Sequence, residues 1–247
     1  MTDQLGWRAI FGVLTPSTNT IVETDYNRML VPGVTSAVGR IHLRTQDLSS
    51  DAAFENLLRE IRDETESALE RLLTAEPDHL VMGMSAETFW GGLDGSREFQ
   101  ERIEDLAQMP VYSGATACQQ ALQIFGAEHI AVVTPYQPEA DRNVRSFFEE
   151  SGFDVVRLTG LRRPSARAIA GTPTDLLRTT LQEIDGDDVQ AIVQVGTNLS
   201  MVGLADEAER WLGKPVIAIN AATWWSALRG AGFDDRLQGF GSLLREH

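Results

Sequence analysis

The sequence is poor in cysteine, since Cys118 is the only one among 247 residues. A single thiol cannot form an intrachain disulfide, and it excludes metal sites built mainly from cysteines. Long hydrophobic runs are also missing, because no uninterrupted apolar stretch approaches the roughly 18 residues that a membrane-spanning helix needs. The N-terminus lacks a basic region followed by an apolar segment, so no secretory signal is predicted. We therefore expect a cytoplasmic protein without a membrane partner.

Positive charge is scarce as well. The chain has 21 Lys and Arg residues against 36 Asp and Glu residues, which gives a formal net charge of −15. This balance argues against nucleic acid or an anionic membrane as the main partner. A small anionic substrate is still compatible with it, because the local field of a site can oppose that of the whole protein. The four histidines lack the spacing of metal ligands, and the glycines match no nucleotide-binding fingerprint.

Short apolar segments alternate with amphipathic ones along the chain. The apolar segments predict strands at 9–14, 35–43, 79–84, 110–113, 130–134, 155–158, 191–195 and 216–219. The amphipathic segments predict helices at 21–30, 54–73, 96–106, 115–125, 139–150, 174–184, 201–212 and 221–229. We expect a loop at 85–92 and a less regular stretch through Pro164 and Gly171. The alternation predicts an α/β fold with parallel sheets covered on both faces.

The second half of the sequence restates the first. Three pairs of segments match in form: 13–20 with 132–137, 80–85 with 192–197, and 109–115 with 214–220. An internal duplication explains the pairs, and we place the first lobe at residues 1–115 with 221–247 and the second at 116–220. Chance recurrence of α/β patterning is the alternative, and it leaves the fold class unchanged.

Small polar residues follow the ends of four predicted strands, where open α/β sheets bind their ligands. Hydroxyl, amide and backbone N–H groups there can stabilise negative charge that develops on a substrate. The alternative is structural, because Ser, Thr and Asn at strand-to-helix junctions commonly cap helices. Tyr136 beside Pro135 can likewise simply pack against its helix.

Five motifs follow one another along the chain: Thr15–Thr20, Gly83–Ser85, Thr134–Tyr136, Gly196–Asn198, and Pro215–Val216 before an Ala-rich helix. In this order they together resemble the Asp/Glu racemase superfamily, in the branch of maleate cis-trans isomerase and arylmalonate decarboxylase. The resemblance implies two flavodoxin-like (Rossmann-like) lobes with parallel four-stranded sheets, related by a pseudo-twofold axis. It also implies a small carboxylic acid bound in the cleft between them, with no metal and no organic cofactor. We expect a homo-oligomer, either a dimer or a tetramer.

The same resemblance implies roles for individual residues. Asn19 and Tyr136 match positions that hold a substrate carboxylate, while Ser85 and Thr197 would flank the reacting carbon. We take Ser85, Thr197 and Tyr136 as candidate catalytic residues. The candidate substrate-binding residues are Ser17, Thr18, Asn19, Gly83, Met84, Thr134, Gly196 and Asn198.

The sequence departs from the family at its cysteines. The racemases and isomerases of the family use two cysteines, one per lobe, and the decarboxylase keeps the one in the second lobe. Here the matching positions are Gly83 and Gly196, while Cys118 falls in a predicted helix as a small buried residue. A cysteine-dependent racemisation or isomerisation therefore lacks its nucleophile.

A site without thiols suits decarboxylation of a malonate-type acid better than racemisation. Decarboxylation needs charge stabilisation and desolvation of the departing carboxylate, whereas racemisation needs two effective bases. The alternative is a non-catalytic or regulatory protein that binds a carboxylate in the same cleft. A hydrolase with Ser85 as nucleophile would need a base that the sequence does not identify. We expect Glu87, the only carboxylate near Gly83, to be a solvated loop residue rather than an acid or base.

Overall fold

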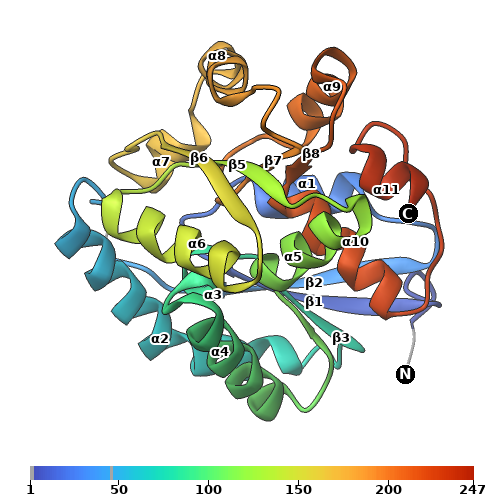
Figure 1. Cartoon of the computed structure of the whole chain (residues 1–247). Helices are drawn as coiled ribbons and strands as arrows, with labels where there is room; N and C mark the ends of the chain where they lie inside the picture. The colour runs from blue at the N-terminus through green and yellow to red at the C-terminus, as the bar shows by residue number, and fades with distance from the viewer. Residues whose placement is uncertain (1–2, 45–46) are drawn as a thin grey trace.

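Two parallel four-stranded sheets form the framework of the chain, as the computed structural model shows (Figure 1). The structure describes residues 3–44 and 47–247; residues 1–2, part of the segment inspected for a signal sequence, and 45–46 lie outside this description. The strand orders are β2-β1-β3-β4 and β6-β5-β7-β8, so the two sheets have the same topology. The strands are β1 (Ala9–Pro16), β2 (Val34–Ile41), β3 (His79–Met82), β4 (Val111–Tyr112), β5 (His129–Thr134), β6 (Asp154–Gly160), β7 (Ala191–Gln194) and β8 (Val216–Ala218).

The central strands are apolar because helices cover both of their faces. All four residues of β7 are buried, and β5 is buried from Ile130 to Thr134. The edge strands β2 and β6 are partly exposed along most of their length. Every strand pair is parallel. This is the pattern of a parallel sheet buried between helical layers, and it confirms the predicted fold class.

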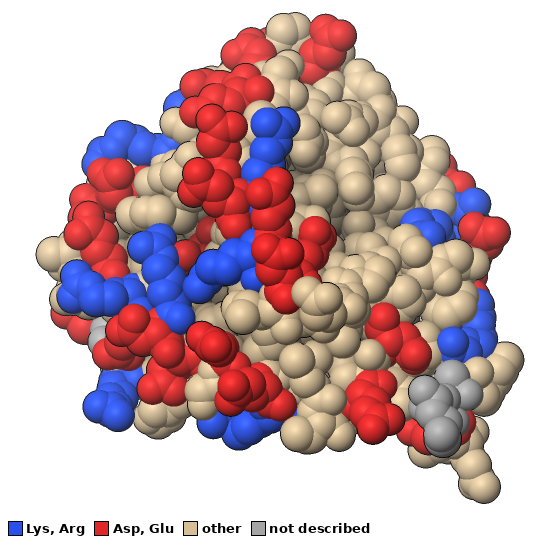
Figure 2. Space-filling model, turned by 90° about the horizontal axis from the view of Figure 1, so that it is seen from below, with Lys and Arg blue, Asp and Glu red and all other residues tan. Residues whose placement is uncertain are grey.

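The helices are α1 (Val22–Arg28), α2 (Asp51–Leu73), α3 (Ala86–Phe89), α4 (Gly92–Ala107), α5 (Gly114–Phe125), α6 (Pro138–Glu150), α7 (Ala166–Ala170), α8 (Thr174–Ile184), α9 (Val202–Leu212), α10 (Ile219–Gly230) and α11 (Ser242–Glu246). Helices α1 to α9 lie between consecutive strands, and α10 and α11 follow the last strand. The half of the molecule that carries α2 and α4 has intermingled acidic and basic side chains, whereas the rest of the same face is mostly uncharged (Figure 2). These two helices therefore bury an apolar side and present a charged side to solvent. No helix within the described residues is long and apolar enough to cross a membrane.

Helix α6, which follows β5 of the second sheet, packs against α2, α3 and α4 of the first (Figure 1). Phe89 of α3 meets Phe147 of α6 edge-to-face, with ring centroids 5.0 Å apart. Helix α10 contacts α1, α5, β3 and β4, and also β8 and α9. The two sheets are thus held together by shared apolar helices, and the exact lobe boundaries stay a prediction.

Two short helices differ from the sequence-based expectation. The predicted loop at 85–92 contains α3, and the predicted irregular stretch contains α7. Ser165 caps helix α7 from the position before it, where its hydroxyl accepts a hydrogen bond from Ala168 N at 3.1 Å. Both helices are about one turn long, too short to give a 3.6-residue periodicity. Both helices contribute residues to the lining of a cavity between the sheets.

Candidate active site

The turn after β1 connects the two sheets through Asn19. Its side-chain oxygen accepts hydrogen bonds from the backbone N–H groups of Ile21 and Val22, both at 3.0 Å, at the start of α1. Its side-chain nitrogen donates to Thr197 Oγ1 at 3.1 Å. The amide therefore accepts hydrogen bonds from N–H groups that have no partner within the helix, as a capping residue does, and it also reaches the turn after β7 in the other sheet.

Ser85 lies where groups from both sheets meet. It precedes α3, yet its hydroxyl makes no capping hydrogen bond. Instead Ser85 Oγ lies 2.5 Å from the Tyr136 hydroxyl and accepts a hydrogen bond from Thr197 N at 3.1 Å. All three residues are at most 5% exposed. The structure thus brings the three predicted catalytic residues into direct contact, and capping does not explain the position of Ser85.

A buried polar cluster holds the turn that carries Tyr136. Tyr136 N donates to Thr134 Oγ1 at 3.1 Å, and the Thr134 hydroxyl donates to the carboxylate of Asp141. Arg162 donates to the Tyr136 carbonyl and to the same carboxylate. Burial raises the pKa of the Tyr136 phenol, although the hydrogen bond with Ser85 lowers it in part. Tyr136 is therefore a protonated, neutral donor at physiological pH.

Hydrogen bonds to α10 and to the turn after β1 hold the turn after β7 in place. Asn220 Nδ2 donates to the Thr197 carbonyl at 2.9 Å and to Asp25 Oδ2, also at 2.9 Å. Asn198 Oδ1 accepts from Thr20 N at 3.0 Å, so this turn is bonded directly to the turn after β1. These contacts orient the Thr197 N–H toward Ser85, which preorganises a donor without using its side chain.

A cavity of about 70 Å³ lies at this junction. Its polar lining includes Asn19, Ser85, Tyr136, Thr197 and Asn198, and none of its described lining residues is a Lys, Arg or His. The largest apolar side chains in the lining are Leu43, Leu48, Phe54, Leu57, Ile61, Met84 and Ile169. Phe54 lies edge-on to the Tyr136 ring at 5.3 Å between centroids. The cavity therefore places neutral hydrogen-bond donors beside an apolar wall.

The structure places eight of the eleven predicted site residues in the lining of this cavity. They are Thr18, Asn19, Met84, Ser85, Tyr136, Gly196, Thr197 and Asn198. The other three support it from outside. Ser17 Oγ accepts from Leu43 N at 3.0 Å, Thr134 holds the Tyr136 turn, and the Gly83 carbonyl accepts from Thr15 Oγ1 at 2.8 Å. None of these three residues lies in the cavity lining, and their part in substrate binding stays a prediction.

The expectation that Glu87 is a solvated loop residue is wrong. Glu87 lies in α3, is 4% exposed and lines the cavity. Arg62 of α2 donates from Nε to Glu87 Oε1 at 2.5 Å, while Oε2 is buried and has no hydrogen-bond partner among the described residues. Burial raises the pKa of this carboxyl, and Arg62 offsets the effect only in part. No sequence pattern indicates this burial, because a one-turn helix is too short to show an apolar face.

Both positions where the family resemblance places a cysteine leave little room for a Cβ, and Gly196 also has a backbone conformation that favours glycine. Gly196 has φ of +110°, and a Cβ added there would lie 2.6 Å from Pro135 Cδ. A Cβ on Gly83 would lie 2.9 Å from Val22 Cγ1. Cys118 is fully buried in α5, outside the lining of the cavity, and burial raises the pKa of its thiol. Its environment is therefore that of an inert core residue.

The family model of arylmalonate decarboxylase matches residues 28–244. The chain belongs to this family. Maleate isomerase from Nocardia farcinica is 25% identical over 98% of this chain and 97% of its own length. Arylmalonate decarboxylase from Bordetella bronchiseptica is 26% identical over 67% of this chain and 70% of its own length. Among solved structures, maleate cis-trans isomerase from Nocardia farcinica with a covalently bound succinylcysteine intermediate superposes with a TM-score of 0.87 at 21% identity, covering 96% of this chain and 98% of that one.

These similarities confirm the predicted branch of the superfamily and the fold. The relatives are isomerases and decarboxylases, so they support an enzyme of this family without specifying its reaction.

Proposed function

We propose that this chain is a cofactor-independent enzyme that acts on a small mono- or dicarboxylic acid without a catalytic cysteine. Decarboxylation of a malonate-type acid is the favoured reaction, and isomerisation or racemisation is the other reaction considered. The observation that carries the proposal is the contact of Ser85 Oγ with the Tyr136 hydroxyl and the Thr197 N–H. In the free protein these groups satisfy one another, and a substrate oxygen that enters the cavity can take over their hydrogen bonds.

The proposed chemistry follows from the charge that this cluster can stabilise. Loss of CO₂ from a malonate leaves an electron pair that is delocalised onto the oxygens of the remaining carboxylate. Neutral donors that already point at that position stabilise this charge, and each contributes about 3–4 kcal/mol in comparable enzymes. Ser85, Tyr136 and Thr197 N supply such donors, while Asn19 and Asn198 line the same cavity.

The apolar wall favours decarboxylation over the other reactions. A carboxylate that faces apolar side chains in place of water is destabilised relative to departing CO₂, which is neutral. Phe54, Leu57 and Ile61 of α2 and Ile169 of α7 provide such surface. They also suit a substrate with an apolar substituent on its α-carbon.

A thiol-independent mechanism is supported by the two glycine positions and by the burial of Cys118. The related isomerase from Nocardia farcinica has been solved with a succinylcysteine intermediate, in which a cysteine is bonded to the substrate carbon. In this chain, the only cysteine is buried outside the cavity. We therefore propose that the reaction proceeds through hydrogen-bonded charge stabilisation and not through a covalent adduct.

The proposal is tested by incubating the protein in deuterated water with substituted malonates, maleate and amino acids, and following each by NMR. We expect turnover of a malonate that carries an apolar substituent, with one deuteron added at the α-carbon. No turnover and no exchange with any acid would contradict it. The non-catalytic alternative predicts that an acid raises the melting temperature and is recovered unchanged. Cytoplasmic location and assembly as a dimer or tetramer stay predictions.

A further inference from the structure

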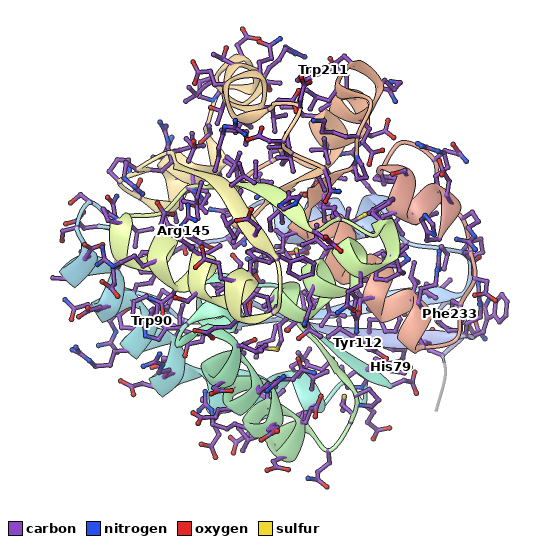
Figure 3. All side chains as sticks on the ribbon, viewed as in Figure 1. His79, Trp90, Tyr112, Arg145, Trp211 and Phe233 are labelled. Atoms are coloured by element: carbon purple, nitrogen blue, oxygen red, sulfur yellow. The ribbon has the colours of Figure 1, made fainter. Side chains whose placement is uncertain are left out.

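Glu87 occupies a boundary between the cavity and the protein surface. It lines the cavity together with Ser85 and Tyr136. It also lines a separate surface pocket formed by residues of α2 and α4 and the turn between α3 and α4, including Arg62, Trp90 and Arg102. Trp90 follows α3 beside α2, where its ring stacks on Phe54 at 6.3 Å between centroids (Figure 3). The Glu87 carboxyl group therefore lies between the cavity and the surface pocket.

The two oxygens of this carboxyl group have different surroundings. Oε1 accepts the hydrogen bond from Arg62, whose side chain is 45% exposed. Oε2 is fully buried and has no hydrogen-bond partner among the described residues. An ionised carboxylate oxygen in that position would be costly, whereas a protonated one can donate to a ligand. The buried oxygen is thus the one suited to carry a proton.

The charged groups around Glu87 come from two helices. Arg62 of α2 is in contact with it, and Arg102 of α4 also favours its ionised form. Their attraction does not compensate fully for burial, so the pKa of Glu87 is raised. Tyr136, the other titratable group of the cavity lining, is neutral because its own pKa is raised by burial. An anionic substrate in the cavity would raise the pKa of Glu87 further by like-charge repulsion.

We propose that Glu87 is the acid that protonates the substrate carbon. This inference rests on the proposed function and adds the proton donor to it. When the C–C bond breaks, CO₂ leaves and the electron pair passes into the enediolate. The enediolate α-carbon then takes the proton from Glu87 Oε2, which leaves Glu87 as a carboxylate paired with Arg62. Water in the surface pocket returns a proton to Glu87 after the product leaves.

The test compares Glu87→Gln with Glu98→Gln in the decarboxylation assay across pH. Glu98 is an exposed residue of the same surface pocket and controls for changes of charge there. We expect kcat to fall about 100-fold or more in Glu87→Gln, with KM little changed, because a glutamine cannot give up a proton. Glu98→Gln should retain the wild-type kcat. Since the acid form is the active one, wild-type kcat should fall as pH rises through the pKa of Glu87 in the complex.

The Arg62→Met variant separates an acid from a merely structural residue at position 87, because it tests the pH dependence of kcat. Loss of the cation destabilises the carboxylate, so the falling limb of kcat should move to higher pH. Infrared difference spectra of wild type against Glu87→Gln should also show a protonated carboxyl band that disappears as pH rises. Wild-type kcat in Glu87→Gln, or a Glu87 that is ionised throughout the pH range in which the wild type is active, would overturn the role of Glu87 alone. Absence of turnover by the wild type would overturn the proposed function, and the role of Glu87 with it.

Discussion

At the scale of single residues, the central feature is that Ser85, which follows a strand of the first sheet, contacts both Tyr136 and Thr197, which follow strands of the second. Serine and tyrosine hydroxyls are weak acids and weak bases, so they do not provide general acid–base strength here. Their value lies in position, because they are already oriented where negative charge would develop. Burial raises the pKa of Tyr136 and so keeps this donor neutral.

Replacing the Tyr136 hydroxyl should therefore affect the chemical step more than substrate binding. We expect Tyr136→Phe to lower kcat by about 10²–10³-fold, the usual effect of losing one preorganised donor. Tyr112→Phe is the matched control, since Tyr112 lies on β4 beside His79, in another pocket (Figure 3). Steady-state kinetics of both variants check this. Equal kcat values in the two variants would show that the Tyr136 hydroxyl does not act in the reaction.

At the scale of elements, the site is built from turns at the carboxyl ends of β1, β3, β5 and β7. Each turn is held by bonds to another one, such as Asn198 Oδ1 with Thr20 N and Asn19 Nδ2 with Thr197 Oγ1. The turn after β7 additionally depends on glycine at its first position. Gly196 has φ of +110° and lies against Pro135, the residue before Tyr136.

Adding a methyl group at Gly196 should consequently disturb two turns at once. We expect Gly196→Ala to lower the free energy of unfolding by about 2–4 kcal/mol, from backbone strain and from overlap with Pro135. Gly203→Ala is the control, because Gly203 is in helix α9 with nothing within 4 Å of the added atom. There alanine should stabilise by up to about 1 kcal/mol. Urea denaturation measures the free energy of unfolding of both variants. A Gly196→Ala variant as stable as the wild type would show that this turn does not depend on glycine.

The elements also show how far the sequence alone can predict this site. The apolar strands and the small polar residues after them are local patterns, so Ser85, Thr197 and Asn19 could be identified without a structure. The burial of Glu87 could not, because it depends on α4 and α6 packing against a one-turn helix. The contribution of Ile169 was missed for a similar reason, since α7 is too short to have a periodic pattern.

At the scale of the whole molecule, acidic groups limit stability at neutral pH. The net charge is −15, and buried Asp25, Glu87 and Asp141 each have a pKa raised chiefly by burial. In the unfolded chain such carboxyls titrate near pH 4. Between that pH and their folded pKa values, the folded protein holds more protons than the unfolded one. Stability therefore falls as pH rises through this window.

Thermal unfolding should accordingly show a higher melting temperature near pH 5 than near pH 8. A difference of one pKa unit at one group corresponds to about 1.4 kcal/mol. Glu87→Gln should reduce the pH dependence, because glutamine does not ionise, whereas Glu101→Gln on the exposed side of α4 should leave it unchanged. Calorimetry at several pH values measures this. If the melting temperature changed with pH in the same way in wild type and Glu87→Gln, Glu87 would be ionised equally in the folded and unfolded states.

The most direct test of a reaction without thiols is the turnover of an accepted malonate by Cys118→Ala, followed by NMR in deuterated water. Cys118 is the only cysteine, and alanine fits its buried place in α5 with a small loss of packing. We expect wild-type kcat and the same incorporation of one deuteron at the α-carbon. Loss of turnover in a variant that is folded by circular dichroism would contradict it, because it would show that the chemistry needs the thiol.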